Sequence, residues 1–279
     1  MGKQEKNDKF YTSNNIIEDL VNSITNIEQY DQLIEPSAGN GSFTKKLEKK
    51  YKQRLISLDI LPEYKNIKKQ NWFDYIVDET KENIMVIGNP PFGDRNHLSI
   101  SFLKKCFKNN NIKTIAFILP NVFNKESKQK LFSKDWFLEV KQELPKNSFY
   151  VKRDDTEYEQ IHIPCTFYVW TKHKVKKDLR FNWDKYRTHK DFKITDKEDA
   201  DFYILGAAPK TIKEVSEVTS KNRGYYIKSN IDINTLKNRI LNINWKEEGN
   251  SSVSGGVSWF SKAELIYTYD KSLEKNVNN

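Results

Sequence analysis

The stretch Ile84-Met85-Val86-Ile87-Gly88-Asn89-Pro90-Pro91-Phe92 decides the fold of this chain. Its first five residues form the continuous apolar run that is typical of a fully buried strand in a parallel sheet. Two consecutive prolines cannot donate hydrogen bonds to a neighbouring strand, so the strand must end at Asn89. Its last carbonyl groups are then free at the carboxyl edge of the sheet, where open α/β sheets bind ligands.

Strand and helix patterns alternate around this stretch, from residue 30 to about residue 140. Further strands are expected to end at Glu35 and Asp59 and to cover parts of 67–73, 114–120 and 165–172. Apolar residues at helical spacing predict helices over 15–27, 42–53, 99–110 and 124–135. This alternation predicts a doubly wound α/β domain, a Rossmann-like sheet with crossover helices.

A charged run at 173–180, HKVKKDLR, marks the expected boundary between two domains. A chain of 279 residues is long enough for one sizeable core and a smaller appended module. We expect an α/β domain over 1–178 and a smaller α+β module over 179–279. In the module, 200–206 and 224–229 are strand candidates and 233–243 is a helix candidate.

Composition favours a polyanionic partner, because 47 lysines and arginines outnumber 38 aspartates and glutamates, a formal charge of +9. An AT-rich genome, which enriches Lys, Asn and Ile throughout a proteome, would give the same excess. Cys106 and Cys165 form neither a disulfide framework nor a zinc motif, which favours a reducing compartment. No signal peptide or membrane-spanning apolar stretch is visible, so we expect a soluble intracellular protein.

The segment Glu35-Pro36-Ser37-Ala38-Gly39-Asn40-Gly41 forms a glycine-rich turn between the first strand and the next helix. Glycines allow a sharp turn and a close backbone approach to a ligand, although the spacing is not GxGxxG. An ordinary strand-to-helix turn would explain this segment alone. Asp59, at the end of the next strand, supplies the context, because its carboxylate can accept hydrogen bonds from both ribose hydroxyls of a nucleoside cofactor.

Asn89, Pro90, Pro91 and Phe92 form a candidate catalytic turn. The Asn89 side-chain oxygen and the Pro90 carbonyl could accept both hydrogens of one amino group, which would direct its lone pair at an electrophilic methyl. The Phe92 ring could stack on a planar base. The alternative is an Asn-Pro turn at a strand end, and the tetrapeptide alone is only moderately specific.

These motifs, in this order, resemble the N6-adenine-specific methyltransferases that carry an NPPF motif on a class I methyltransferase fold. The resemblance covers roughly the first 175 residues. The matching segments are KFYTSNNI (9–16), EPSAGNGSF (35–43), LDI (58–60), IGNPPFG (87–93), TIAFILP (114–120) and IPCTFYVWTK (163–172).

The resemblance implies S-adenosylmethionine as the methyl donor and an adenine flipped out of its stack as the acceptor. Transferred to this sequence, it implies a catalytic role for Asn89, Pro90, Pro91 and Phe92. The residues that it implies for the cofactor are Tyr11, Thr12, Glu35, Pro36, Ala38, Gly39, Gly41, Asp59, Ile60, Asn71 and Trp72.

The chain departs from the family pattern after the third strand, where Asn71-Trp72-Phe73 replaces an acidic residue followed by Phe-Leu. An asparagine oxygen can still accept a hydrogen bond from the cofactor's adenine amine. We therefore expect cofactor binding to be retained, with Asp74 as the alternative acceptor.

The four histidines, His97, His162, His173 and His189, have no metal-ligand spacing, so no metal is expected. His162 precedes the 165–172 strand and is a candidate substrate contact. Trp259, Phe260 and Lys262 follow a diglycine and are candidates for stacking on or contacting nucleic acid. A hairpin with a packed aromatic pair is the slightly favoured alternative for this segment.

The leading functional hypothesis is methylation of adenine N6 in DNA, with the carboxyl-terminal module recognising the substrate. Adenine-N6 methylation of RNA is the main alternative, because the same turn would serve both polymers. Methylation of a protein glutamine fits the basic charge and Phe92 less well. A non-catalytic nucleic-acid-binding subunit of the same fold is a fourth alternative, against which both intact motifs argue.

Overall fold

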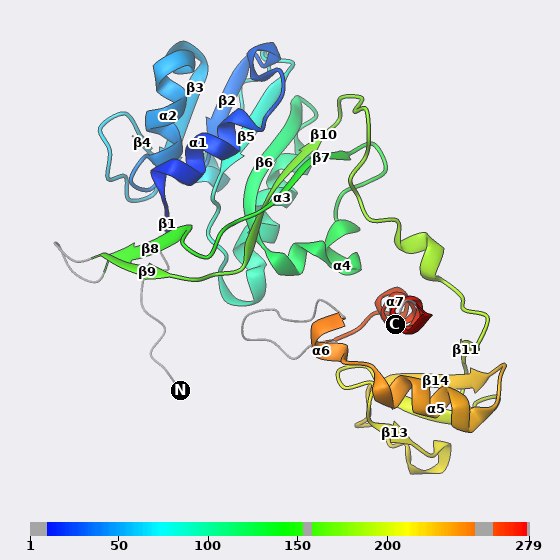
Figure 1. Ribbon diagram of the computed structural model, residues 1–279. Helices are drawn as coiled ribbons and strands as arrows, with labels where there is room; N and C mark the ends of the chain where they lie inside the picture. Colours follow the sequence, from blue (N-terminus) through cyan, green and yellow to red (C-terminus); the bar gives the residue numbers. More distant parts are fainter. Residues whose placement is uncertain (1–9, 153–157, 249–258, 278–279) are drawn as a thin grey trace. The chain divides into compact units, whose positions relative to one another are not determined.

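The structure is a computed structural model that describes residues 10–152, 158–248 and 259–277. These residues form two compact units, drawn in Figure 1. The first unit is the chain up to Asn121 together with Phe132–Arg180, and the second is Val122–Leu131 together with the chain from Phe181 onward. The chain thus leaves the first unit at Arg180, close to the expected boundary at 178, and Val122–Leu131 joins the second unit, which the sequence did not indicate.

The first unit is built on a seven-stranded sheet of order β4-β3-β2-β5-β6-β10-β7. Its strands are β2 (Gln32–Glu35), β3 (Leu55–Asp59), β4 (Lys68–Lys69), β5 (Ile84–Gly88), β6 (Ile112–Pro120), β7 (Phe137–Glu143) and β10 (Cys165–Thr171). Strands β2 to β6 are parallel, and β10 is antiparallel to both β6 and β7. This largely parallel sheet with crossover helices confirms the predicted Rossmann-like α/β fold class.

Helices cover the sheet as the apolar spacing predicts. They are α1 (Asn14–Asn22), α2 (Ser42–Tyr51) and α3 (His97–Lys108). Ile17 and Leu20 of α1 pack with Phe43 of α2 in one cluster with alternate residues of the central strands. Strand β5 is fully buried, which is why its sequence reads as an unbroken apolar run. Helix α1 ends at Asn22 rather than at residue 27.

The helix expected over 124–135 is reduced to the single turn α4 (Glu126–Gln129). This turn belongs to the second unit, where the buried Glu126 carboxylate is paired with Arg187 and accepts a hydrogen bond from Ser261. Tertiary partners therefore determine the conformation of this segment more strongly than its helical propensity does. The rest of the predicted helix, from Lys130 to Asp135, forms turns that lead to β7.

A second, three-stranded sheet in the first unit joins β1 (Tyr11–Thr12), β8 (Phe149–Lys152) and β9 (Tyr158–Ile161) in the order β1-β8-β9. Tyr11 is paired with Tyr150 and Thr12 with Phe149, both in antiparallel register. Segments nearly the whole domain apart in sequence are thus held side by side (Figure 1). The sequence pattern did not predict this sheet.

The second unit is the smaller α+β module that the sequence predicts. Its antiparallel sheet has the order β11-β14-β12-β13, with β11 (Phe192–Thr195), β12 (Phe202–Leu205), β13 (Ile212–Lys213) and β14 (Gly224–Ser229). Its helices are α5 (Ile233–Asn242), α6 (Trp245–Glu248) and α7 (Lys262–Val277). Helix α7 begins two residues after Phe260, and the diglycine of the expected hairpin lies outside the described residues.

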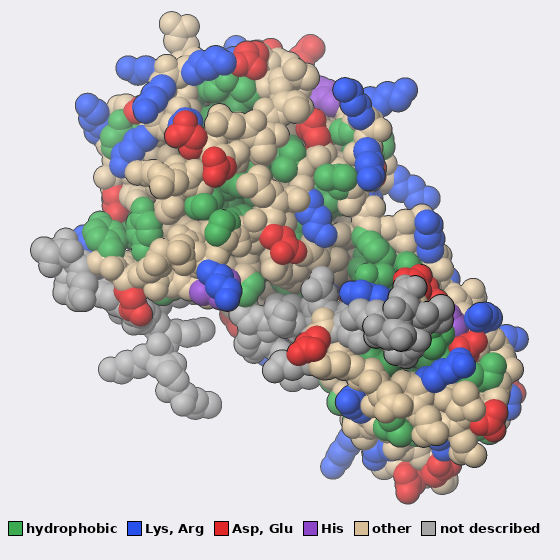
Figure 2. Space-filling model, in the orientation of Figure 1, with side chains coloured by type: hydrophobic (Ala, Val, Ile, Leu, Met, Phe, Trp, Pro, Cys, Tyr) green, Lys and Arg blue, Asp and Glu red, His purple; other side chains and the backbone are tan. Residues whose placement is uncertain are grey.

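Short 3-10 helices complete the chain: η1 (Ile27–Gln29), η2 (Lys52–Arg54), η3 (Trp72–Asp74), η4 (Asp94–Asn96), η5 (Asn121–Asn124), η6 (Trp183–Tyr186) and η7 (Val215–Glu217). None of the helices in the described ranges is long and apolar enough to cross a membrane. Figure 2 shows basic side chains interspersed with acidic ones on the visible face of each unit. Net charge alone therefore does not mark a binding surface on that face.

Candidate functional site

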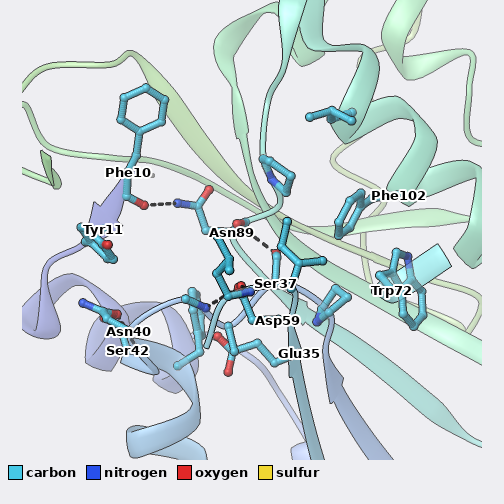
Figure 3. Close-up of a pocket in the computed structure, with 18 of the residues that line it drawn as sticks. Phe10, Tyr11, Glu35, Ser37, Asn40, Ser42, Asp59, Trp72, Asn89 and Phe102 are labelled. Carbon is cyan, nitrogen blue, oxygen red and sulfur yellow. Dashed lines mark hydrogen bonds between the residues drawn. The ribbon is translucent and has the colours of Figure 1, made fainter. Parts of the chain in front are cut away.

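The candidate site is a pocket of about 650 Å³ at the carboxyl edge of the first unit's parallel strands (Figure 3). It is lined by β1, by the segments that follow β2, β3 and β5, by η3 and by α3. Of the residues that the sequence proposes for the cofactor, those that line it are Tyr11, Thr12, Glu35, Pro36, Ala38, Gly39, Asp59, Ile60, Asn71 and Trp72. Gly41, which the sequence also proposes for the cofactor, does not line the pocket. Of the proposed catalytic turn, Asn89 and Pro91 line the pocket.

The glycine-rich turn after β2 bends sharply into α2. Gly39 and Gly41 both have left-handed backbone conformations, with φ of +52° and +80°. A Cβ on Gly41 would also lie 2.9 Å from a ring atom of Tyr64, so only glycine fits there. The backbone amide of Gly39 donates to Asp59 Oδ2 at 2.7 Å, which fixes the turn against the end of β3.

Asp59 is buried at the end of β3, and both of its carboxylate oxygens accept backbone hydrogen bonds. Oδ2 accepts from Gly39 and Oδ1 accepts from the amide of Leu61 at 2.8 Å. A carboxylate has about four acceptor positions, so these two bonds orient Asp59 and leave acceptor capacity toward the pocket. The arrangement suits a ligand with a pair of hydroxyl groups.

Glu35 is buried at the end of β2 and is only 2% exposed. Desolvation raises the pKa of Glu35 to about 8, and the nearby Asp59 carboxylate acts in the same direction. Glu35 contacts the hydroxyl of Thr44, which lies 2.7 Å from Ser57 Oγ. The Thr44 hydroxyl donates its one hydrogen to Glu35 Oε2, so the Ser57 hydroxyl is the donor in its contact with Thr44.

Asn89 follows β5, and its side-chain amide is held by the amino-terminal segment. Nδ2 donates to the Phe10 carbonyl oxygen at 3.3 Å (Figure 3) and to Thr12 Oγ1 at the same distance. The Phe10 carbonyl can only accept, so it fixes the nitrogen side of the amide and leaves Oδ1 on the other side. Oδ1 is buried and has no hydrogen-bond partner among the described residues. Likewise, no described residue donates to the Pro90 carbonyl oxygen.

Phe92 does not present a free ring face. It is 9% exposed, and its ring stacks on that of Phe10 with centroids 5.9 Å apart and planes inclined by 30°. Neither Phe92 nor Pro90 lines the pocket, whereas Phe10 does. The expected stacking surface for a base is therefore covered by Phe10 in this structure.

The apolar end of the pocket is formed around η3. Trp72 is 1% exposed and contacts Phe102 of α3, while Ile60 is exposed at the pocket's rim. The Asn71 side-chain oxygen, expected to accept from the cofactor, accepts from the amide of Phe73 at 3.0 Å and so caps η3. Its second lone pair remains available. Asp74, the alternative acceptor, does not line the pocket.

Sequence reasoning missed several residues that line the pocket. Those omitted from the proposed set are Phe10, Ser37, Asn40, Ser42, Phe43, Leu61, Phe73, Gly93, Leu98 and Phe102. Ser37 donates to the Asn89 carbonyl oxygen at 3.2 Å, which ties the glycine-rich turn to the catalytic turn. Most lie next to a predicted residue, so proximity to the motifs would have found them. Leu98 and Phe102 face the pocket from α3, and only helical spacing after Asn89 points to them.

The residues proposed for substrate contact lie outside this pocket. His162 is exposed after β9 and does not line it. Trp259, Phe260 and Lys262 belong to the second unit. Phe260 is 2% exposed and packs in that unit's core, so Trp259 is the accessible member of the pair. Within the described ranges, no group of three His, Cys, Asp or Glu side chains could hold a metal ion.

No protein-family model matches this chain, and no protein of curated function matches its sequence. Among solved structures, it is similar to a Listeria monocytogenes protein provisionally named a class I S-adenosylmethionine-dependent methyltransferase. The sequence identity is 12%, the TM-score is 0.39, and the match covers 59% of this chain and 60% of that chain. A likeness at this level says nothing about activity. Strand order, register and pocket geometry therefore carry the functional argument.

Proposed function

We propose that this protein transfers a methyl group from S-adenosylmethionine to the N6 amine of adenine in nucleic acid, with DNA as the favoured polymer. The observation that carries the proposal is Oδ1 of Asn89 at the carboxyl edge of β5, which is buried and has no hydrogen-bond partner in the described part of the chain. Leaving a buried acceptor unpaired costs about 1–3 kcal/mol. A ligand amine that donates to this oxygen would recover that free energy.

The residues around the pocket fit the proposed cofactor. Asp59 would accept the ribose hydroxyls, because its carboxylate is oriented by two backbone amides and retains acceptor capacity. The glycine-rich turn allows close backbone approach to a ligand, because Gly39, which lines the pocket, carries no side chain. Trp72 and Ile60 offer apolar surface to a planar ring. When bound, the cofactor supplies a methyl group on a sulfonium, an electrophile that needs no further activation.

In the proposed reaction, Asn89 and Pro90 orient the acceptor. Their two free oxygens accept the two hydrogens of the amine, which directs its lone pair at the methyl group. This interaction strengthens as positive charge develops on the nitrogen, so it favours the transition state over the bound substrate. Phe92 would stack on the base once the Phe10 ring has moved aside.

A polyanionic substrate is supported by the formal charge of +9. Methylation of RNA is the principal alternative, because an extruded adenine presents the same amine in either polymer. A protein glutamine would also offer a planar amide to Asn89.

The proposal is tested by following tritium from labelled S-adenosylmethionine into duplex DNA, single-stranded DNA, RNA and protein in parallel. We expect label in nucleic acid, with DNA above RNA. Label confined to protein would contradict the proposal, and so would cofactor binding without transfer to any of the four polymers. If the label is found mainly in RNA, the proposed reaction stands, but its substrate is RNA rather than DNA.

A further inference from the structure

One face of the second unit's sheet is not used for its core. Side chains alternate between the two faces of a strand. Ile204 of β12 and Ile227 of β14 enter the core, so the adjacent Tyr203 and Tyr226 lie on the opposite face. The register places these two tyrosines directly across from each other, with ring centroids 4.8 Å apart. This outer face therefore carries an aromatic pair rather than a solvated polar row.

A hollow of about 660 Å³ lies at this aromatic pair, within the second unit. Besides Tyr203 and Tyr226, its lining includes a third aromatic side chain, Trp259, and two cationic ones, Lys197 and Arg223. None of the described residues that line it is acidic, although Asp196, Glu198 and Asp199 are neighbours of Lys197 in sequence. The hollow thus combines ring surfaces with positive charge.

The indole of Trp259 is held at the rim of this hollow. A Cβ added to Gly206 would lie 2.6 Å from Cη2 of the indole, so the ring rests directly on the glycine backbone. Tyr225 lies beside it at 6.1 Å between ring centroids. Trp259 nevertheless remains 39% exposed. A large aromatic surface that is positioned but not covered is available to a planar ligand.

Two basic residues on neighbouring strands and helices of this unit are paired with carboxylates, whereas, among the described residues, the two cations of the hollow are not. Lys228 is paired with Asp201, and Lys237 with Glu214. Within the described part of the chain, Arg223 and Lys197 have no ion-pair partner. A free guanidinium can donate two parallel hydrogen bonds to a phosphate group. Beyond the hollow, Lys193 lies opposite Lys228 in the register of β11 and β14 and adds one further positive charge on the same face.

We infer that this hollow binds one unpaired nucleotide of a polynucleotide, with the base stacked on Trp259 and the phosphate held by Arg223 and Lys197. Ring stacking combined with phosphate contacts is how proteins bind single-stranded nucleic acid without base readout. That this polynucleotide is also the substrate of methyl transfer rests on the proposed function. The site itself lies wholly within the second unit and differs from the pocket in the first.

The test measures binding of short fluorescein-labelled single strands, of DNA and of RNA, to the full-length protein by anisotropy across a salt series. Trp259→Ala should weaken binding at least fivefold, since stacking contributes about 1–3 kcal/mol per base, and should leave the salt dependence unchanged. Arg223→Ala should weaken binding and also lower the slope of log K against log salt by about 0.7. Trp259→Phe keeps a stacking ring and should recover most of the affinity.

Lys185→Ala is the matched control for charge, because Lys185 is exposed in the same unit and does not line the hollow. It should leave affinity within about twofold. The inference is overturned if wild type binds neither strand, if folded Trp259→Ala binds as wild type does, or if Lys185→Ala weakens binding as much as Arg223→Ala. Wild type that binds through these residues but transfers no methyl group would refute the proposed function and leave the nucleotide site standing. If the wild type transfers methyl groups but Trp259→Ala and Arg223→Ala bind the strands as the wild type does, the nucleotide site is refuted and the proposed function stands.

Discussion

The Phe10 carbonyl oxygen accepts a hydrogen bond from Asn89 Nδ2 at 3.3 Å, and the same residue's ring stacks on Phe92. Phe10 thus contacts both functional side chains of the proposed catalytic turn. Through its backbone it orients the Asn89 amide so that Oδ1 is free. Through its ring it stacks on Phe92, the surface that is proposed for a base.

Phe10→Ala tests whether this ring competes with the base. The variant removes the contact with Phe92 but keeps the carbonyl that orients Asn89. Aromatic pairs contribute about 0.5–1.5 kcal/mol, so a DNA probe with an unpaired adenine should bind about two- to tenfold more tightly than it binds wild type. Anisotropy titration measures this change. Weaker binding by a folded variant would show that Phe10 itself holds the substrate.

Asn89→Ala should abolish transfer while leaving the affinity for S-adenosylmethionine within a few-fold. The variant removes an acceptor that orients the amine, and losses of preorganised groups of this kind lower kcat by about 10²–10³. Single-turnover transfer and calorimetry report the two quantities. Asn83→Ala is the matched control, because Asn83 precedes β5 at its other end and does not line the pocket. Loss of cofactor binding in folded Asn89→Ala would place this residue in the cofactor site instead.

Asp59→Asn should show the opposite pattern, with weakened cofactor binding as its main effect. An amide keeps the shape of the side chain but offers one acceptor oxygen where the carboxylate offers two. Hydrogen bonds to a charged group contribute about 1.5–3 kcal/mol each, so the Kd for S-adenosylmethionine should rise by about tenfold or more. Calorimetry measures the Kd, and thermal unfolding controls for the lost bond to Gly39 or Leu61. Unchanged affinity would mean that the cofactor does not lie against Asp59.

Glu35→Gln should make the protein more stable at neutral pH. Burial raises the pKa of Glu35 from 4.5 to about 8. At pH values between these two, the Glu35 carboxyl is ionised in the unfolded chain but keeps its proton in the folded protein. The free energy of unfolding of the wild type therefore falls as pH rises, by up to about 1.4 kcal/mol per pH unit. An amide cannot ionise, and its side-chain oxygen can still accept the hydrogen bond from Thr44.

Urea unfolding should therefore give Glu35→Gln and wild type similar free energies of unfolding near pH 4.5. Toward pH 8, the free energy of unfolding of the variant should exceed that of the wild type by a growing margin. Glu79→Gln, at an exposed loop position, is the control and should follow wild type. Stability curves for Glu35→Gln and wild type that stay parallel across the range would contradict a protonated Glu35.

The sequence predicted the parallel part of the sheet because burial on both faces leaves a mark in it. Strand β5 reads as an unbroken apolar run, and Pro90 and Pro91 fix its end. Asp59 and the glycine-rich turn are recognisable because their backbone geometry requires those residue types at those places. Each of these features depends on residues that are close together along the chain, so a single sequence is enough to locate it.

The features that sequence reasoning missed depend on distant partners. Strand β1 is two residues long and forms only because it pairs with β8, far along the chain. The turn α4 joins the second unit through Glu126 and its contacts with Arg187 and Ser261. The stacking of Phe10 on Phe92 also follows from tertiary placement, which is why Phe92 was expected to be free. No local pattern encodes such contacts.

The most direct test of the central claim is the identity of the methylated nucleoside. Polymer labelled by the wild-type protein is digested to nucleosides and separated by chromatography with mass detection, beside a parallel reaction with Asn89→Ala. If Asn89 Oδ1 orients the adenine amine, wild type yields N6-methylated adenosine or deoxyadenosine as its sole labelled nucleoside, and Asn89→Ala yields none. Label in a methylated cytosine, at another position of adenine, or undiminished in Asn89→Ala would contradict the account.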